Sequence, residues 1–195
     1  MALNRRKLAI VGMAALLLSG CAAQDNGYVE KLQQTYTQLD GFTAQVKILS
    51  DLGQSTLEYS GHFAYNREGT DILTLEAPEA VAGIQISVSG IQGENLTVQY
   101  ADTVLDSGQP ARTGLTPADA IPLLLDAVRL DAPLETWEES VGGTKMVAAR
   151  YETEDAYGRI MRQVWFSRDS LRPAYAELYA DGERVLQVFF REFEE

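Results

Sequence analysis

The feature that most constrains the fold of this chain is a strict alternation of apolar and polar residues that begins after Gly41. In residues 42–48 every even position is apolar and every odd position is polar, and residues 57–65 alternate in a similar way. A period of two gives a strand one apolar and one polar face. Two-faced strands of this kind are typical of antiparallel sheets that are covered on one side only. Strand-like segments also occur at residues 72–76, 84–88, 96–100, 146–153, 159–166, 174–179 and 184–193.

Two helices are predicted among these strands. Apolar residues recur at spacings of four, four and three from Tyr28 to Leu39, which predicts a helix over residues 25–40 with Gly41 as its C-cap. A second helix is predicted near residues 117–130, where Thr116 is a candidate N-cap. Pro122 leaves a later start open, because a proline in a helix interior costs about 3 kcal/mol.

The order of these elements predicts the architecture. A helix, about five strands, a second helix and about four strands follow one another without an internal linker or repeat. We therefore expect one domain over residues 28–195 with an α+β fold. One large curved antiparallel sheet would carry both helices on its concave face, because this arrangement buries every apolar stripe.

The N-terminal residues predict export and lipidation. Three basic residues at positions 5–7 precede an apolar run over residues 8–18, which is too short for the roughly 20 residues of a membrane-spanning helix. Residues 18–21, Leu-Ser-Gly-Cys, resemble the lipobox of bacterial lipoproteins. We therefore expect a signal peptide over residues 1–20, lipidation of Cys21, and a short tether over residues 21–27. The alternative is an ordinary secretory signal followed by a chance cysteine.

This prediction sets the location and the chemistry of the mature chain. The protein would lie outside the cytoplasm, anchored by lipid to a bacterial membrane. An outer-membrane location stays open if the cell has two membranes, because Ala22 is not the aspartate of inner-membrane retention. Cys21 is the only cysteine, so no disulfide is expected. The full chain has a net charge of −12, and loss of three basic residues with the signal leaves −15. This charge argues against a nucleic-acid partner, which requires basic patches.

The residues offer little catalytic chemistry. His62 is the only histidine, whereas zinc sites usually need several His or Cys ligands. The carboxylate pair Glu138-Glu139 would act on glycosides only if it converged with others in a cleft, and it lies where a solvated surface is expected. No phosphate-binding loop or dinucleotide motif occurs. We therefore expect no catalytic residue, no metal, no cofactor and no enzymatic activity.

At this point the chain resembles a known family, the LolA/LolB-like lipoprotein carriers. The resemblance covers nearly all of residues 25–195 and depends on element order and on local segments at residues 39–44, 61–65, 76–79 and 94–97. The later segments look most like lipidated members of the germination-lipoprotein (GerS) type. The resemblance implies a half-open β-barrel lidded by helices. Unlike the soluble carriers this chain has a lipobox, and no segment matches the protruding loop of the lipidated receptor.

The resemblance and the aromatic stripes together give two functional hypotheses. In the first, the half-barrel holds an acyl chain, a lipid or a lipoprotein, and a packed core is the equally weighted alternative. In the second, the protein is a membrane-tethered partner of a cell-envelope enzyme in spore germination or cell-wall metabolism. Ala44, Gly61 and Ala148 are small enough to leave space in a cavity. Candidate cavity-lining residues are Tyr28, Tyr36, Phe42, Tyr59, Phe63, Tyr65, Trp165 and Phe189.

Overall fold

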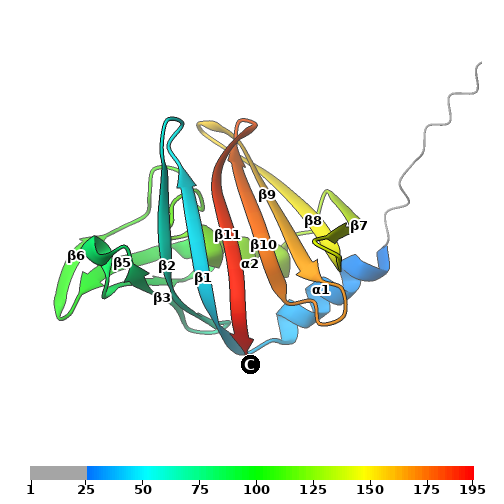
Figure 1. Ribbon diagram of the computed structural model, residues 1–195, viewed down its shortest axis with the longest axis horizontal. Helices are drawn as coiled ribbons and strands as arrows, with labels where there is room; N and C mark the ends of the chain where they lie inside the picture. Colours follow the sequence, from blue (N-terminus) through cyan, green and yellow to red (C-terminus); the bar gives the residue numbers. More distant parts are fainter. Residues whose placement is uncertain (1–25) are drawn as a thin grey trace, which may run out of the picture.

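The computed structural model describes residues 26–195, which form an eleven-stranded antiparallel sheet and two α-helices (Figure 1). The predicted signal peptide, Cys21 and most of the predicted tether lie outside the described residues, so export and lipidation stay predictions. The elements are α1 (Asn26–Gln38), β1 (Gly41–Asp51), β2 (Thr56–Asn66), β3 (Thr70–Ala77), η1 (Glu79–Val81), β4 (Ile84–Ser89), η2 (Ile91–Gly93), β5 (Asn95–Tyr100), β6 (Thr103–Ser107), α2 (Ala120–Leu130), β7 (Glu135–Val141), β8 (Thr144–Asp155), β9 (Gly158–Ser167), β10 (Pro173–Ala180) and β11 (Glu183–Glu194).

The sheet consists of two meanders joined at its centre. Strands β1 to β6 pair in sequence order, and strands β7 to β11 do the same. The first and last strands then pair with each other, with Val46 opposite Phe190 and Ile48 opposite Val188. The strand order is therefore β6-β5-β4-β3-β2-β1-β11-β10-β9-β8-β7, and the sheet stays open because β6 and β7 do not meet.

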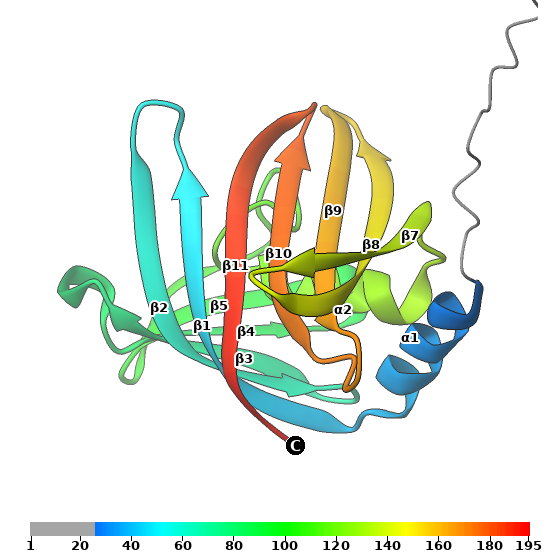
Figure 2. The ribbon, with the colours of Figure 1, turned by 45° about the vertical axis from the view of Figure 1, so that its right-hand side comes forward.

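Both helices cover the concave face of this sheet. In Figure 1 helix α2 lies behind strands β11 and β10, and in Figure 2 strands β3 to β5 run at a steep angle to β11, so that the sheet wraps around α2. Apolar residues of both helices join one buried cluster with the even-numbered residues of β1 and the odd-numbered residues of β2. The predicted α+β half-barrel with helices on its concave face is confirmed.

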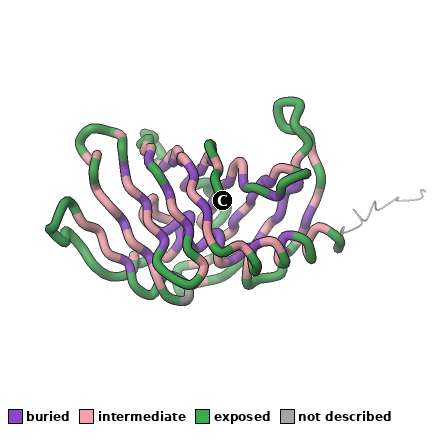
Figure 3. Tube along the Cα trace, turned by 90° about the horizontal axis from the view of Figure 1, so that it is seen from below, coloured by how far each residue is buried: buried purple, intermediate pink, exposed green. Residues whose placement is uncertain are grey.

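Burial follows the alternation of the sequence. Strand β1 alternates between half-buried and buried residues along its whole length, because its even-numbered side chains point toward the helices. Figure 3 shows the buried residues in the middle of the strands and the exposed residues at the hairpin loops. Within residues 26–195 neither helix has the length and apolar character to span a membrane.

The start of α2 differs from both predicted starts, because its N-cap is Asp119 and not Thr116, and the helix does not begin at Pro122. The helix begins at Ala120, so Pro122 lies in its first turn, where a backbone N–H has no intrahelical partner to lose. Asp119 is almost fully buried, and its carboxylate accepts hydrogen bonds from the Thr116 N–H at 3.1 Å and the Thr116 hydroxyl at 2.6 Å. A third bond comes from the Gly114 N–H at 2.7 Å. Asp119 therefore holds the loop that leads into α2.

Candidate functional site

Most of the predicted cavity-lining aromatic residues lie on the concave side of the sheet and are packed. Tyr36, Phe42, Phe63 and Tyr65 are each at most 6% exposed. The rings of Phe42 and Phe63 are 6.0 Å apart, and those of Phe42 and Tyr65 are 5.3 Å apart. Tyr36 donates a hydrogen bond to the Leu171 carbonyl at 3.0 Å. These residues fill the centre of the half-barrel with protein atoms.

Tyr28 and Tyr59 are half-buried at the margin of this core. The Tyr28 hydroxyl donates to a Glu138 carboxylate oxygen at 2.5 Å and accepts a hydrogen bond from Arg168 at 3.0 Å. The hydrogen bond from Tyr28 and the charge of Arg168 lower the pKa of Glu138. Tyr28 therefore fastens the start of α1 to β7 and to the turn after β9.

The placement of Trp165 and Phe189 corrects the sequence expectation. Both residues pair with Tyr175 on the convex face, with ring centroids 5.1 Å and 4.8 Å from the Tyr175 ring. The adjacent Phe166 contacts Tyr36 of α1 at 5.7 Å. Because successive side chains of a strand point to opposite faces, Trp165 points away from the helices. Neither residue lines the concave side.

Trp165 is nonetheless only 8% exposed, and Glu139 of the edge strand β7 lies against its indole. The Trp165 indole and the Trp137 indole both donate hydrogen bonds to the same oxygen of Glu139, the latter at 3.2 Å. Ala148 lies between the two indoles in the pairing of β7, β8 and β9. The small side chain of Ala148 therefore makes room for indoles on the convex face and not for a cavity.

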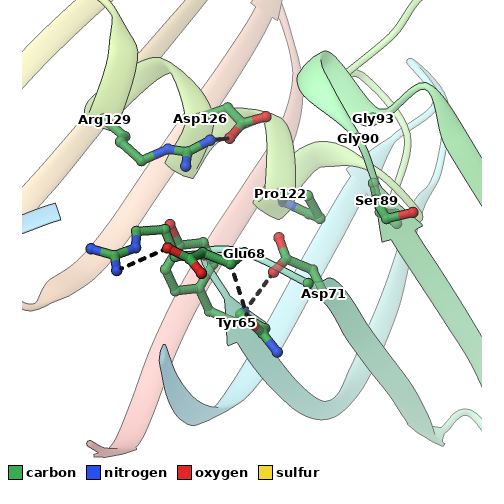
Figure 4. Close-up of a pocket in the computed structure, with 13 residues that line it drawn as sticks. Tyr65, Glu68, Asp71, Ser89, Gly90, Gly93, Pro122, Asp126 and Arg129 are labelled. Atoms are coloured by element: carbon green, nitrogen blue, oxygen red, sulfur yellow. Dashed lines mark hydrogen bonds and ion pairs between the residues drawn. The ribbon is translucent and has the colours of Figure 1, made fainter. Parts of the chain in front are cut away.

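Open space remains on the two sides of α2. The first site, here named the hairpin pocket, has a volume of about 250 Å³ and lies between α2 and the turn from β2 to β3. Figure 4 shows the ion pair of Asp126 and Arg129 on α2 facing Tyr65 and Asp71 across this pocket. The ion pair measures 2.7 Å, and the Tyr65 hydroxyl has no hydrogen-bond partner among the described residues.

Asp71 is the notable titratable group of the hairpin pocket. Its side chain is 9% exposed, and one carboxylate oxygen accepts a hydrogen bond from the Asn66 N–H at 2.8 Å. Burial raises the pKa of Asp71 to about 7; the Asn66 bond and Arg129 oppose this shift and Asp126 adds to it. Asp71 is the first of the buried, inward-facing residues of β3, and its carboxyl group therefore has a pKa near neutral.

The second site, here named the arginine pocket, has a volume of about 380 Å³ and lies between α2 and the adjoining ends of β8 and β9. Leu123, Ala127 and Leu130 line its helix side, and Ile160 and Arg162 line its sheet side. Ligand sites in proteins typically have volumes of about 300–1,000 Å³. The arginine pocket falls in this range and the hairpin pocket below it, so the arginine pocket is the better candidate for a ligand.

Arg162 was not predicted as a site residue. It lies on β9 between Leu178 of β10 and Tyr151 of β8, on the concave side, and is 6% exposed. Burial lowers the pKa of Arg162, while the carboxylates of Asp131 and Asp119 oppose this shift. The guanidinium is thus a buried positive charge on the wall of the larger pocket.

Metal-binding clusters and the single histidine bear on whether the described residues hold catalytic chemistry. No group of three or more His, Cys, Asp or Glu residues within positions 26–195 is placed to hold a metal ion. His62 is exposed on the convex side of β2. The two pockets beside α2 each contain a buried titratable group, Asp71 in the hairpin pocket and Arg162 in the arginine pocket.

Solved structures with a similar fold come from several bacteria. No sequence-family model and no curated protein sequence matches the chain. A DUF1329 family protein from Desulfovibrio piger has 14% identity and a TM-score of 0.48, with 86% of this chain and 90% of that chain covered. A LolA superfamily protein from Nitrosomonas europaea has 16% identity, a TM-score of 0.45, and coverages of 89% and 94%.

A third similar structure is the complex of the CwlD amidase with the GerS lipoprotein from Clostridioides difficile. Its matched chain has 14% identity and a TM-score of 0.42, and 99% of each chain is covered. At these identities the likeness is one of fold. The curved antiparallel half-barrel with helices on its concave face is established by the structure of the chain itself.

Proposed function

We propose that this protein is a lipid-anchored, non-enzymatic binding protein of the bacterial envelope that holds a single apolar chain in the arginine pocket. The observation that carries this proposal is the presence of four apolar residues, Leu123, Ala127, Leu130 and Ile160, in the lining of an open volume of about 380 Å³; its other lining residues are polar or charged. Apolar-walled clefts of this size suit small ligands that bring their own apolar surface.

The size of the pocket limits the ligand. If each chain atom takes about the volume of one water, roughly 30 Å³, the arginine pocket accommodates about a dozen chain atoms. This volume suits one chain of about ten carbons. It is too small for the several acyl chains of a lipoprotein, and the packed aromatic core offers no further space at the centre of the half-barrel.

Binding of 1-decanol tests the proposal, because this probe has an apolar chain and no charge. Burying about nine methylenes at about 0.8 kcal/mol each gives about 7 kcal/mol, from which the entropic cost of association is subtracted. The methylene contribution alone corresponds to a dissociation constant of roughly 10 μM, so we expect saturable binding with a constant well above this value in a calorimetric titration. The protein for this titration is residues 21–195 with Cys21→Ser, which includes every described residue.

A matched pair of variants locates the bound chain. Leu130 lines the arginine pocket and is 55% exposed, whereas Leu105 on β6 is 56% exposed and outside the pocket. We expect Leu130→Gln to weaken decanol binding about three- to tenfold through lost apolar contact, and Leu105→Gln to leave it unchanged. Absence of saturable binding to the unsubstituted pocket would contradict this function and favour a protein partner instead.

The lipid anchor is tested separately in a bacterial host. We expect the full chain to fractionate with membranes and to incorporate labelled palmitate, because two or three acyl chains bind a bilayer firmly. Cys21→Ser should lose the label and move to the soluble extracytoplasmic fraction, and Ala22→Ser should behave as the unsubstituted chain. Retention of the label by the Cys21→Ser variant would show that the anchor is not at this residue.

A further inference from the structure

Arg162 is a buried guanidinium with few partners. Its one hydrogen bond runs from Nη1 to the Thr153 hydroxyl at 3.4 Å, and its Nε has no partner among the described residues. Within residues 26–195 it forms no ion pair at 4.0 Å or less. An arginine has five N–H donors, and a buried charge is costly unless it is paired. The side chain therefore has donors available for an anion that is not part of the described chain.

The neighbouring carboxylates do not take up these donors. Asp126 pairs with Arg129 at 2.7 Å, and Asp155 pairs with Arg112 at 3.0 Å. Asp119 accepts three hydrogen bonds from its own loop. The other acidic residues of the pocket, Asp131 and Glu154, are exposed to solvent. The acidic groups near Arg162 are thus either bound elsewhere or hydrated.

The loop before α2 approaches Arg162 closely. Gly114 lies so close that a Cβ built on it would be 2.8 Å from the Nη2 atom of Arg162 and 3.3 Å from Leu123 Cβ. Gly114 also has a φ of +77°, which favours glycine. The loop before α2 therefore approaches the guanidinium closely and restricts it to the wall of the pocket, next to the apolar residues Leu123 and Ile160.

We infer that the arginine pocket takes an amphipathic acid, with the anionic head on the Arg162 guanidinium and the apolar chain along Leu123, Ala127 and Leu130 of α2. This inference depends on the proposed function and adds the class of ligand to it. A carboxylate matches the planar guanidinium with two parallel hydrogen bonds, and a phosphate monoester provides a similar pair of oxygens. The ligand is thus a fatty acid or a single-chain lipid phosphate.

Three probes with the same chain separate the head group from the chain. Decanoate, decyl phosphate and 1-decanol are titrated into residues 21–195 with Cys21→Ser, and their dissociation constants are compared. We expect at least one of the two acids to bind about ten- to a hundredfold more tightly than the alcohol, because hydrogen bonds to a charged group are strong in a site sheltered from water. The acid with the lower dissociation constant identifies the head group.

Substitution of Arg162 tests the role of the guanidinium. Arg162→Met retains an apolar stem of similar reach, and the replacement of a buried charge by an apolar residue is often tolerated. We expect the variant to bind acid and alcohol with nearly equal affinity. Arg162→Lys should keep a preference for the acids, reduced because an ammonium lacks the bidentate geometry.

The outcomes separate the two proposals. Equal binding of acids and alcohol to the unsubstituted pocket would overturn the acid inference and leave the chain-binding function intact. A preference for acids that persists in Arg162→Met would assign the anion to another residue. Absence of binding by all three probes would overturn both proposals. Equal binding of acids and alcohol by the unsubstituted protein would overturn the inference even if neither variant folds.

Discussion

A Gly61→Ala variant is expected to lose about 3 kcal/mol of unfolding free energy. Gly61 is buried in β2, where it pairs with Val46 of β1 and Leu75 of β3. A Cβ at this position would lie 2.2 Å from the Thr74 carbonyl oxygen and 3.1 Å from Leu75 Cα. Both atoms are backbone, so a rotamer change cannot relieve the clash and β3 must move away from β2. Urea unfolding followed by circular dichroism measures the loss.

Gly142→Ala is the matched control for this substitution. Gly142 lies in the turn between β7 and β8, with a φ of +58° and no atom within 4 Å of a Cβ built on it. Only the left-handed backbone conformation opposes an alanine there, at about 1 kcal/mol. Equal losses for the two variants would show that close approach of β3 is not the cause. Because β3 occupies the space beside Gly61, this glycine does not contribute to a cavity.

Asp71→Asn is expected to stabilise the protein above neutral pH by as much as about 4 kcal/mol. Burial raises the pKa of Asp71 from 3.8 to about 7 in the folded state. Between these two values the folded state holds a proton that the unfolded chain has released. The unfolding free energy of the native sequence therefore decreases as pH rises from about 4 to about 7, by about 1.4 kcal/mol per unit of pKa shift. Asparagine carries no charge, so the variant lacks this decrease.

The measurement is the difference in unfolding free energy between variant and native sequence, at pH 4.5, 6 and 8. The difference should be about 1 kcal/mol at pH 4.5, where the unfolded chain has already released most of the proton, and grow toward pH 8 as the folded state keeps its proton up to about pH 7. Asp102→Asn removes the same charge from an exposed position in the turn between β5 and β6 and serves as the control. A variant at position 71 that is less stable than the native sequence at pH 8 would contradict the prediction.

The alternation of apolar and polar residues predicted most of the sheet but not its edges. Strands β6 and β7, which are the two edge strands, were not predicted. All five residues of β6 are exposed, so no buried face imposes a period of two on its sequence. Strand β7 is rich in glutamate, whose charge disfavours pairing of an edge strand with another chain. The same glutamates interrupt the alternation of apolar and polar residues by which a strand is predicted. Edge strands are difficult to predict because burial, the source of the pattern, is weakest there.

Helix boundaries were predicted less well than helix existence. Gly41 was expected as the C-cap of α1, yet it is the first residue of β1, and α1 ends at Gln38. A Cβ on Gly41 would lie 2.8 Å from the Tyr65 carbonyl oxygen. The absence of a side chain at Gly41 thus allows β1 and β2 to approach each other closely. This need for glycine arises from Tyr65, which is more than twenty residues away in the sequence.

The candidate site was largely missed, although a signal for it was present. Aromatic residues were chosen without regard to strand parity, which is why Trp165 and Phe189 were assigned to the wrong face. Arg162 shares its parity with Ile160, Val164 and Phe166, all of which are buried. A charged residue within an inward-facing apolar series indicates a buried polar group. Asp71, which precedes the buried Leu73 and Leu75, shows the same signal.

The volume of each pocket could not be predicted, because packing depends on contacts between distant elements. Helical spacing places Leu123, Ala127 and Leu130 on one side of α2 and Pro122, Asp126 and Arg129 on another. The distance from these residues to β9 or to the turn between β2 and β3 cannot be obtained from the sequence. The curvature of the sheet around α2 sets this distance, and with it whether side chains fill the space beside the helix.

The pairing of β1 with β11 has a consequence for how the protein is made. Strand β11, the last of the sheet in chain order, lies at the centre of the sheet, and β1 pairs with it from Thr43 to Ser50. Until the C-terminal residues arrive, one side of β1 exposes a row of unpaired backbone groups to other chains. Pairing between strands that are far apart in the sequence is slow, and partly folded chains with unpaired strand edges are prone to aggregate. Removal of residues 184–195 would therefore split the sheet at its centre.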